Sequence, residues 1–376
     1  MRIAIVGCGF VADFYMQSLP LYPMLELAAV YDRDTKRAQE FASFHRLSCL
    51  RATLDEVLSD ASIQLVINLT NPDSHFEVSR ACLLAGKHVY SEKPIAMQFD
   101  QAQELYDLAQ QLGLRIACAP CNVLSQTAQG LWKALREKVV GDVKLVYAEM
   151  DDGLVHKMPY RKWLSDSGRP WPWKDEFEVG CTLEHAGYYV TWLTAFFGPA
   201  VSVTAFSSCI YPDKETDEPL DRLAPDFSVG VIRFASGAIA RLTCSIIAPR
   251  DQRFQLFGDK GILYVDDSWD YKAPVHIKRM INIRRKMIIS PWTKRYRLPE
   301  ATNTIRARKG ANPMEFCRGP AEIATAILEN RESAMPSDYC LHNNEIVLAI
   351  QYAMENSTTV QMKTSFKSIQ PMPWAR

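Results

Sequence analysis

The amino-acid sequence predicts an α/β fold in two parts, the first of which is a doubly wound parallel sheet. The chain opens on a short apolar run, Ile3 to Val6, which is followed by glycines and then by a helical pattern. Apolar runs and helical patterns alternate from there as far as Pro120. Beyond Pro120 strands follow one another closely with hairpin turns between them, so we expect the second part to be α+β.

Length and composition indicate a globular protein with two domains. The chain has 376 residues, 48% of them apolar and 23% charged, which suits a soluble protein with a large core. We place the domains at residues 1–120 and 121–376. Lys plus Arg and Asp plus Glu both number 43, so the net charge gives no pull toward nucleic acid.

Several features favour a cytoplasmic protein. No basic-then-apolar leader opens the chain, and no apolar stretch is long and uncharged enough to span a bilayer. The ten cysteines are scattered in apolar contexts, as is typical of reduced, buried thiols.

The first strand runs into a dinucleotide-binding motif of the form G-x-G-x-x-G/A. Its members are Gly7, Cys8, Gly9, Phe10, Val11 and Ala12. Gly7 permits a tight turn, Gly9 lets the backbone approach a pyrophosphate, and Ala12 lets the helix pack closely on the strand. The helix that begins near Phe10 would direct its free N–H groups at the phosphates.

The second apolar run ends in an acidic residue that favours NAD. Leu25 to Tyr31 is followed by Asp32, 23 residues after Gly9, where a carboxylate can bind the hydroxyls of the adenosine ribose. A carboxylate repels the 2′-phosphate of NADP, although Arg33 beside it could partly reverse that preference. NADP therefore stays open as the cofactor.

The rest of the first part continues the alternation. Helices are expected at Thr35 to His45, at Leu54 to Leu58, in a segment ending at Ala85, and in a segment capped by Asp100 and ending at Gln111. Strands are expected at Gln64 to Leu69, His88 to Ser91 and Arg115 to Ala119. The turn after the third strand contains Thr70, Asn71, Pro72 and His75. It belongs to the carboxyl edge of the sheet, where such folds bind ligands.

Cys118 and Cys121 form a C-x-x-C pair that two uses could explain. Redox chemistry is one, and coincidental thiols in a loop near the cofactor are the other. No second C-x-x-C or paired histidine completes a zinc site, so we expect no metal.

The second part opens with a helix at Gln126 to Lys138 and a strand at Val143 to Glu149. Residues 153–179 follow without helical or strand period, and a loop this long is more often functional than idle. Trp163, Trp171 and Trp173 could stack on sugar faces, or the loop could be a rigid structural element.

The remaining segments complete the α+β part. An apolar helix is expected from Gly180 to Phe197, and strands are expected at Val201 to Ile210, Phe227 to Phe234, Ala238 to Ile246, Arg253 to Phe257 and Ile262 to Asp266. Two further helices are expected at Pro313 to Asn330 and His342 to Asn356, followed by a tail after Ser365. Because Arg318-Gly319-Pro320 interrupts the first of these helices, a start around Ala321 is the alternative to Pro313. Residues 275–297 carry many Lys and Arg and no acid. A solvated strand pair in an oligomer, a phosphate-bearing substrate and an anionic membrane surface are competing explanations.

Together these motifs resemble the Gfo/Idh/MocA oxidoreductases. The resemblance rests on GxGxxA, Asp32, the T-x-P-x-x-H of residues 70–75 and above all the AGKHVYSEKPIA of residues 85–96; it continues loosely to the NEIVLAIQYA of residues 344–353. It implies a Rossmann domain followed by an open, mostly antiparallel sheet. It also implies hydride transfer between NAD(P) and a carbinol carbon of a sugar, inositol or nucleotide sugar, and a homodimer or homotetramer formed through the sheet.

The resemblance assigns a catalytic role to Lys93, whose ammonium could polarise a carbonyl and pass a proton. Glu92 supplies a neighbouring charge, and the bond to Pro94 is often cis in the family.

The family pattern also places Glu184 and Tyr188 at its acid–base positions, one helical turn apart. These two residues and Lys93 are candidates for substrate binding too. His185 is the alternative to Tyr188 as catalytic residue, and Asn122 is a candidate cofactor contact.

The predicted function is an NAD(P)-dependent oxidoreductase acting on CH–OH groups of a small, sugar-like molecule. Two alternatives remain. One is an NAD-dependent, redox-neutral glycoside hydrolase, and the other is a non-catalytic NAD(P)-binding regulator.

Overall fold

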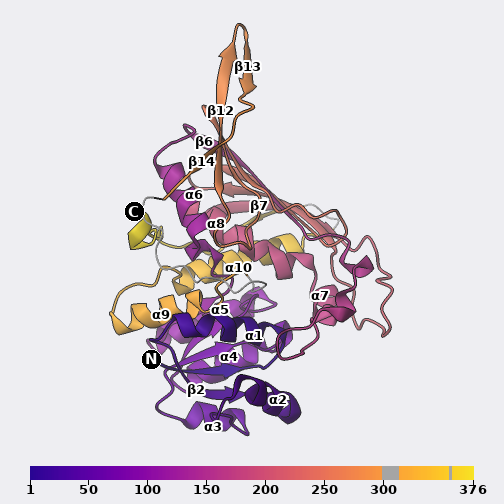
Figure 1. Cartoon of the computed structure of the whole chain (residues 1–376), viewed down its shortest axis with the longest axis vertical. Coiled ribbons are helices and arrows are strands. Elements are labelled where there is room, and N and C mark those ends of the chain that lie inside the picture. The colour runs from indigo at the N-terminus through magenta and orange to yellow at the C-terminus, as the bar shows by residue number, and fades with distance from the viewer. Residues whose placement is uncertain (299–312, 355–357) are drawn as a thin grey trace.

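Two β-sheets organise the chain in the computed structural model, which describes residues 1–298, 313–354 and 358–376. The first sheet and its helices form one end of the molecule, and the second sheet with a projecting hairpin forms the other (Figure 1). In these three ranges no helix is long and apolar enough to cross a membrane.

The first sheet has five described strands in the order β2-β1-β3-β4-β5, all parallel. They are β1 (Arg2–Val6), β2 (Glu26–Tyr31), β3 (Leu65–Asn68), β4 (His88–Ser91) and β5 (Ile116–Cys118). The connecting helices are α1 (Phe10–Ser18), α2 (Thr35–His45), α3 (Leu54–Ser59), α4 (His75–Leu84) and α5 (Phe99–Gln111). Because parallel strands are covered on both faces, β1 and β3 are apolar almost throughout. The predicted doubly wound sheet is confirmed.

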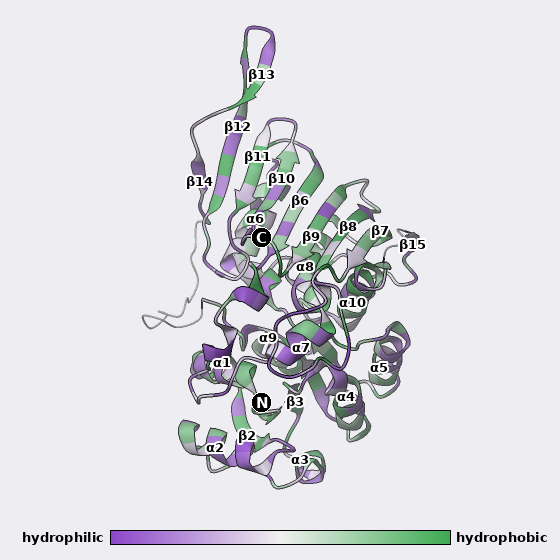
Figure 2. Cartoon of the chain, turned by 90° about the vertical axis from the view of Figure 1, so that its right-hand side faces the viewer, coloured by the Kyte–Doolittle hydropathy of each residue, from purple (hydrophilic) through white to green (hydrophobic). Residues whose placement is uncertain are grey.

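The second sheet has ten described strands and is antiparallel except for the pair β6 and β9. The strands are β6 (Val143–Asp151), β7 (Ala200–Ser208), β8 (Phe227–Phe234), β9 (Ile239–Ser245), β10 (Phe254–Gly258), β11 (Gly261–Val265), β12 (Val275–Ile283), β13 (Lys286–Ile289), β14 (Lys294–Tyr296) and β15 (Thr359–Gln361). This confirms the open, mostly antiparallel sheet. Figure 2 shows apolar and polar residues alternating along its strands, as expected for a sheet with one face covered.

The second half of the chain also contains helices, some of which pack on the second sheet and some of which join it to the first. The helices of this half are α6 (Gln126–Arg136), α7 (Trp173–Val179), α8 (Gly187–Phe197), α9 (Arg318–Leu328) and α10 (Ser337–Gln351). α10 packs on β7 and β8 and also on α5 and β5, while α9 packs on β4 and β5 of the first sheet. The chain therefore returns to the first sheet after building the second.

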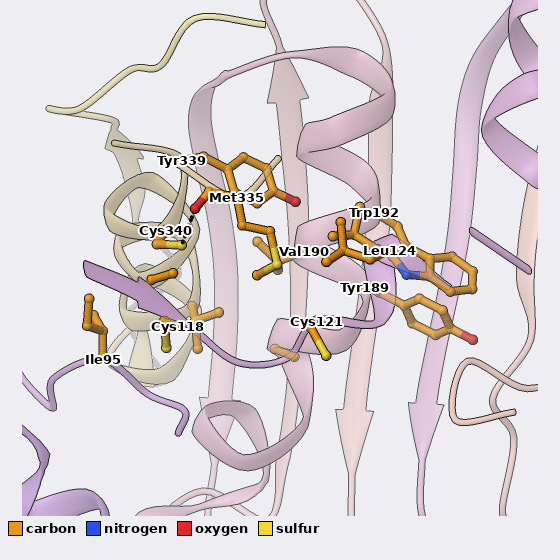
Figure 3. Close-up of a cluster of buried hydrophobic side chains, with 14 of the residues drawn as sticks. Ile95, Cys118, Cys121, Leu124, Tyr189, Val190, Trp192, Met335, Tyr339 and Cys340 are labelled. Atoms are coloured by element: carbon orange, nitrogen blue, oxygen red, sulfur yellow. Dashed lines mark hydrogen bonds between the residues drawn. The ribbon is translucent and has the colours of Figure 1, made fainter. Parts of the chain in front are cut away.

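One continuous core of buried side chains runs from the first sheet into the second. Figure 3 shows the part of this core that lies where the two halves meet. The labelled residues are Ile95, Cys118, Cys121, Leu124, Tyr189, Val190, Trp192, Met335, Tyr339 and Cys340. Because segments distant in sequence share this cluster, the two halves stabilise each other.

Several element boundaries differ from expectation. Gln98 rather than Asp100 precedes α5. α9 begins at Arg318, which lies between the two expected starts at Pro313 and around Ala321. Residues 173–179, expected to be irregular, form α7, which begins directly after Pro172. Asn356, the expected end of the last helix, lies outside the described residues.

The expected tail after Ser365 is wrong. Phe366 is buried, with its ring 5.2 Å from that of Tyr339 on α10. Ala375 is buried as well, and its carbonyl accepts a hydrogen bond from Arg136 of α6. The C-terminal segment therefore covers part of the core, which no local sequence pattern indicated.

Candidate active site

The turn after β1 has the geometry that the glycine motif predicts. Gly7 has φ of +102°, and a Cβ there would lie 2.5 Å from the carbonyl oxygen of Leu69 at the end of β3. Gly9 precedes α1, and a Cβ there would meet no atom within 4 Å. No side chain caps the first turn of α1. Open space therefore borders the N-terminus of this helix, as a pyrophosphate requires.

Asp32 is fixed at the end of β2 by backbone donors. Its two oxygens accept hydrogen bonds from the N–H groups of Cys8 and Asp34, each at 2.8 Å. The guanidinium of Arg37 lies 3.7 Å from one of them, whereas Arg33 is exposed. An anchored carboxylate beside the glycine turn fits the ribose of a dinucleotide. Arg37 is a nearby cation that the sequence analysis missed.

The turn from Thr70 to His75 is held by Asn68, a residue that the sequence analysis did not select. The Asn68 side chain accepts a hydrogen bond from the Thr70 hydroxyl at 2.7 Å and donates one to the His75 carbonyl at 3.1 Å. The ring nitrogens of His75 lie 2.7 Å from the Pro94 carbonyl oxygen and 2.9 Å from that of Thr70. His75 thus links this turn to the segment that carries Lys93.

Asn71 and Pro72 begin the short helical turn that precedes α4, at the same edge of the sheet. Burial lowers the pKa of His75 below its ordinary value, while its contacts with the Pro94 and Thr70 carbonyls oppose that shift.

Lys93 forms an ion pair with Glu184 between the two halves of the chain. Its ammonium donates a hydrogen bond to the Glu184 carboxylate, and the two side chains are only 20% and 12% exposed. Burial alone would lower the pKa of Lys93, but the charges of Glu184, Tyr188 and Glu92 raise it above its ordinary value. Lys93 is therefore held as a cation. The bond from Lys93 to Pro94 is cis, as the family resemblance implies.

Glu92 is turned away from this ion pair toward α1. Its carboxylate accepts a hydrogen bond from the Tyr15 hydroxyl at 2.7 Å and lies 3.2 Å from the Lys93 backbone nitrogen. It contributes charge to the site while tying α1 to the end of β4.

Tyr188 and Glu184 meet at Lys93 through an unusual helical turn. Residues 182–186 form a π-helical turn that leads into α8, a feature frequent at functional sites. Burial raises the pKa of Tyr188, so its hydroxyl keeps its proton. The expected proximity of Glu184 and Tyr188 is thus present, although on a wider turn than an α-helix.

Asn122 fixes the backbone of Tyr188 from within the protein. Its amide donates to the Tyr188 carbonyl at 2.9 Å and accepts from the Thr191 hydroxyl at 3.1 Å. The side chain is fully buried. These contacts give Asn122 a positioning role, and its contact with a cofactor stays a prediction.

His185 pairs with Glu176 of α7, whereas the carboxylate partner of Lys93 is Glu184. The Nε2 atom of His185 lies 2.8 Å from the Glu176 carboxylate, and both side chains are buried. Burial alone would lower the pKa of His185, but Glu176 raises it to about 9. The indole of Trp269 stacks on the imidazole with 5.9 Å between ring centroids. Sequence reasoning missed Glu176 and Trp269 because no local pattern joins them to residue 185.

The three tryptophans of the long loop pack among aromatic neighbours. Trp163 and Trp171 lie 5.0 Å apart between ring centroids, and Trp173 lies 6.0 Å from Tyr160. Their rings are partly buried against the core. Such packing favours the structural alternative for these residues, and contact with a sugar stays a prediction.

Residues 163–171 of this loop, named the strap here, cross to the first domain's helices. The strap is closed on itself by a hydrogen bond from the Trp171 N–H to the Trp163 carbonyl at 2.9 Å. Ser167 donates to Asp13 of α1 through its backbone and its hydroxyl, at 2.9 and 2.7 Å. Arg169 pairs with Glu40 of α2. The strap thus connects the second half of the chain to both helices that flank Asp32.

The C-x-x-C pair has separate surroundings for its two thiols. Cys118 donates to the carbonyl of Ala119 at 3.1 Å, and the Cys121 sulfur lies 3.4 Å from the Tyr271 hydroxyl. Burial raises the pKa of both thiols. All ten cysteines are free.

A parallel sheet with this glycine turn and this anchored carboxylate defines a dinucleotide-binding protein of the Rossmann class. Residues 1–119 match the family described as "Oxidoreductase family, NAD-binding Rossmann fold", and residues 129–264 match "GFO/IDH/MocA C-terminal domain". The chain belongs to the Gfo/Idh/MocA family of NAD(P)-dependent oxidoreductases.

Relatives in sequence and structure agree with this assignment. An uncharacterised oxidoreductase from Synechocystis is 27% identical over 290 residues, which cover 72% of this chain and 73% of the relative. A bovine trans-1,2-dihydrobenzene-1,2-diol dehydrogenase is 24% identical over 272 residues, covering 72% and 75%. An Actinomadura kijaniata 3-ketoreductase solved with NADP shares the fold, with a TM-score of 0.70, 19% identity and coverage of 94% and 98%.

Proposed function

We propose that this chain moves a hydride between NAD(P) and the carbinol or ketone carbon of a small, sugar-like substrate. The observation that carries the proposal is the Lys93–Glu184 ion pair with Tyr188 beside it, at the carboxyl edge of β4. Ligands of such sheets bind at this edge. A sugar, an inositol or a nucleotide sugar is the substrate class that we expect.

Each residue of this group has a distinct task. The nicotinamide, when bound, supplies or accepts the hydride. Lys93 passes a proton to or from the substrate oxygen, since its ammonium is the cation held at the site. Glu184 orients the Lys93 ammonium, and the protonated Tyr188 hydroxyl donates a hydrogen bond to a substrate oxygen.

The cofactor would be held by the residues of the first sheet's edge. Gly7 to Ala12 form the turn that faces a pyrophosphate, and Asp32 would accept hydrogen bonds from ribose hydroxyls. NAD is the preferred cofactor, because Asp32 brings negative charge where NADP has a phosphate.

Relatives support a substrate with hydroxyls on a ring. Those matched in sequence include dehydrogenases of a cyclic diol. Structural neighbours with TM-scores of 0.70 and 0.65 are a 3-ketoreductase and a UDP-N-acetylglucosamine 3-dehydrogenase from Acidithiobacillus ferrooxidans. All of these names describe chemistry at a carbinol or ketone carbon.

A homo-oligomer formed through the second sheet completes the proposal. The sheet face opposite the helices exposes apolar side chains, namely Leu145, Val201, Val231 and Ile239, which are 38–42% exposed. A second copy of the chain would remove them from water.

The test is a screen of keto sugars and nucleotide sugars for oxidation of NADH, with Lys93→Ala beside the wild type. We expect the substitution to lower kcat by about 10²–10⁴-fold, because general acid catalysis typically contributes that much. NADH binding, followed by nicotinamide fluorescence, should stay unchanged. Lys144→Ala, at an exposed lysine of β6, is the matched control.

Wild-type turnover by the Lys93→Ala variant would contradict the proposed role of Lys93. Tightly co-purified NAD without net oxidation of NADH by any ketone would instead favour the redox-neutral hydrolase.

A further inference from the structure

The hairpin formed by β12 and β13, together with β14, concentrates positive charge in one place. We name residues 275–297 the basic arm. It contains eight of the 43 Lys and Arg residues and none of the 43 Asp and Glu residues. The cations are Lys278, Arg279, Arg284, Arg285, Lys286, Lys294, Arg295 and Arg297. The rest of the chain therefore has an excess of acidic residues.

The basic arm projects away from the body of the molecule. Figures 1 and 2 show the β12–β13 hairpin extending beyond the other strands of the second sheet. Residues 282–289 at its end are all exposed. The side chains of this part of the arm are therefore accessible to solvent and to a partner.

Both faces of the projecting hairpin carry apolar side chains. Met280 pairs with Ile289, and the next pair along the strands is Ile281 with Ile288. Because successive cross-strand pairs point to opposite faces, each face carries one of these apolar pairs. The exposed fractions reach 59% at Met287 and 75% at Trp292.

Within residues 1–298, 313–354 and 358–376, the cations of the basic arm have no carboxylate partners. None of the eight forms an ion pair with a carboxylate of the described residues, although most charged side chains elsewhere in those ranges have one within reach. Lys278 lies over the ring of Tyr264 with its ammonium 5.6 Å from the centroid, and Arg279 donates to the carbonyl of Val139. The other six side chains carry positive charge into solvent.

We propose that the basic arm binds the surface of a membrane that contains anionic phospholipids. Arg284 to Lys286 lie at the turn of the hairpin, next to the exposed Met287, Ile288 and Ile289. Lys294 and Arg295 lie at the base of the arm, where they pair with Ile277 and His276. At a bilayer surface, the apolar side chains can enter the boundary between headgroups and acyl chains while the cations at the tip and base of the arm meet phosphates. The long Lys and Arg stems can reach the headgroup layer from partly buried positions.

Charge and shape favour lipid over other occupants. A second copy of the chain that paired symmetrically through this arm would bring the same eight cations against it, and these charges repel one another. An acidic protein that covered one face of the hairpin would leave the apolar side chains of the other face in water. A lipid interface surrounds the arm and satisfies both faces together with the cations.

The experiment is co-sedimentation of the full chain with vesicles of phosphatidylcholine, with and without about one third phosphatidylglycerol, the anionic component expected to carry the attraction. The variant Arg284→Glu/Arg285→Glu/Lys286→Glu reverses three charges at the tip of the arm. Its matched control, Lys144→Glu/Lys260→Glu/Lys367→Glu, makes the same change at exposed lysines outside the arm. A third variant, Ile288→Ser/Trp292→Ser, removes apolar area and keeps the charge.

We expect the wild type and the control to bind the anionic vesicles only, and to dissociate as salt is added. The charge reversal should weaken partitioning by roughly 100-fold or more, since each cation near the surface contributes about a fivefold factor. The Ser variant should bind more weakly than the wild type. Unchanged NADH binding by every variant will show that each is folded.

Equal binding to neutral vesicles, or binding that survives the charge reversal, would overturn the proposal. The proposal would also be overturned if the charge-reversal variant failed to bind the vesicles and its molar mass by light scattering fell below that of the wild type. That outcome would make the basic arm an interface between copies of the chain.

Discussion

Asp32 has a structural role in the turn after β1, and we propose that it also selects the cofactor. Its carboxylate accepts two backbone hydrogen bonds, and Arg37 lies 3.7 Å away. Replacing it with a neutral isostere separates these tasks, because an amide oxygen can still accept a hydrogen bond from Cys8 while the charge is lost.

We expect Asp32→Asn to raise the affinity for NADPH relative to NADH by about tenfold or more, which corresponds to about 1.4 kcal/mol. The positive charge of Arg37 would then be free to attract the 2′-phosphate. Fluorescence titration with both reduced cofactors measures the ratio. Asp34→Asn, two residues away and also near Arg37, is the control that should leave it unchanged. An unchanged ratio in Asp32→Asn would mean that Asp32 does not select the cofactor.

The Glu176–His185 pair predicts a dependence of stability on pH. The pKa of His185 is raised from 6.5 to about 9 in the folded chain, so the folded state holds this proton more tightly than the unfolded state. The stabilisation is complete below about pH 6.5 and is lost as the pH rises through about 9. Its size is on the order of 3 kcal/mol.

In the wild type, the unfolding free energy should fall as the pH rises from 6.5 to 9, and we expect this fall to be smaller in His185→Gln. Urea denaturation at several pH values measures the unfolding free energy. In the control, His276→Gln, the slope should match the wild type, because burial lowers the pKa of His276 and its ring is already neutral in this range. A wild-type slope in His185→Gln would assign the pH dependence to another group.

At the scale of the elements, the strap connects the two halves of the chain, and no pattern in its own sequence predicts this contact. Asp13 accepts hydrogen bonds from the backbone and the hydroxyl of Ser167, and its other oxygen lies 2.6 Å from His45. Removing this carboxylate should release the strap from α1.

We expect Asp13→Ala to speed tryptic cleavage beside the strap, after Arg161 or Lys162, by about tenfold. Hydrogen bonds to a charged group contribute about 1.5–3 kcal/mol, and opening of the strap would become more frequent accordingly. Peptide mapping over time measures the rate. Asp55→Ala, at an exposed acid in the first turn of α3, should leave it unchanged. Equal rates in the two variants would show that other contacts hold the strap.

The π-helical turn before α8 also makes contacts that its own sequence does not indicate. It carries Glu184 toward Lys93 and His185 toward Glu176, so consecutive side chains serve two separate ion pairs. A regular apolar helix was the expectation for this segment, and the apolar pattern of α8 itself is present.

At the scale of the molecule, α9 shows that the two halves are not independent. It follows the second sheet in sequence but packs on β4 and β5 of the first. Gly319 is the point of closest approach, since a Cβ there would lie 2.3 Å from the hydroxyl oxygen of Tyr90. The division into domains at residues 1–120 and 121–376 stays a prediction, and this contact crosses it.

We expect Gly319→Val to destabilise the full chain by about 1–3 kcal/mol, the usual cost of overpacking a buried contact. Thermal unfolding measures the loss. Gly237→Val is not a suitable control, because Gly237 has a positive φ. The control is Ala326→Val, at another buried small residue of α9, which tests whether the effect belongs to the Tyr90 contact. If Gly319→Val unfolds at the wild-type temperature, α9 is only loosely held on the first sheet.

Local patterns determined most of the first half of the chain. The β–α alternation, the glycine turn, Asp32 at the end of β2 and Lys93 after β4 depend on residues close in sequence, and each lies where its pattern predicts. The hairpin strands of the second sheet were equally visible, since turn residues and alternation are local signals.

Tertiary structure alone decided which distant segments contact one another. The pairing of Glu176 with His185, the strap across α1 and α2, the return of α9 to the first sheet and the buried C-terminal segment all join residues that no period or spacing relates. The basic arm was visible as a run of charge, but only the fold showed that it projects from the body. Such contacts form because burial of apolar surface and pairing of buried charges stabilise any two segments that the fold brings together, whatever their distance in sequence.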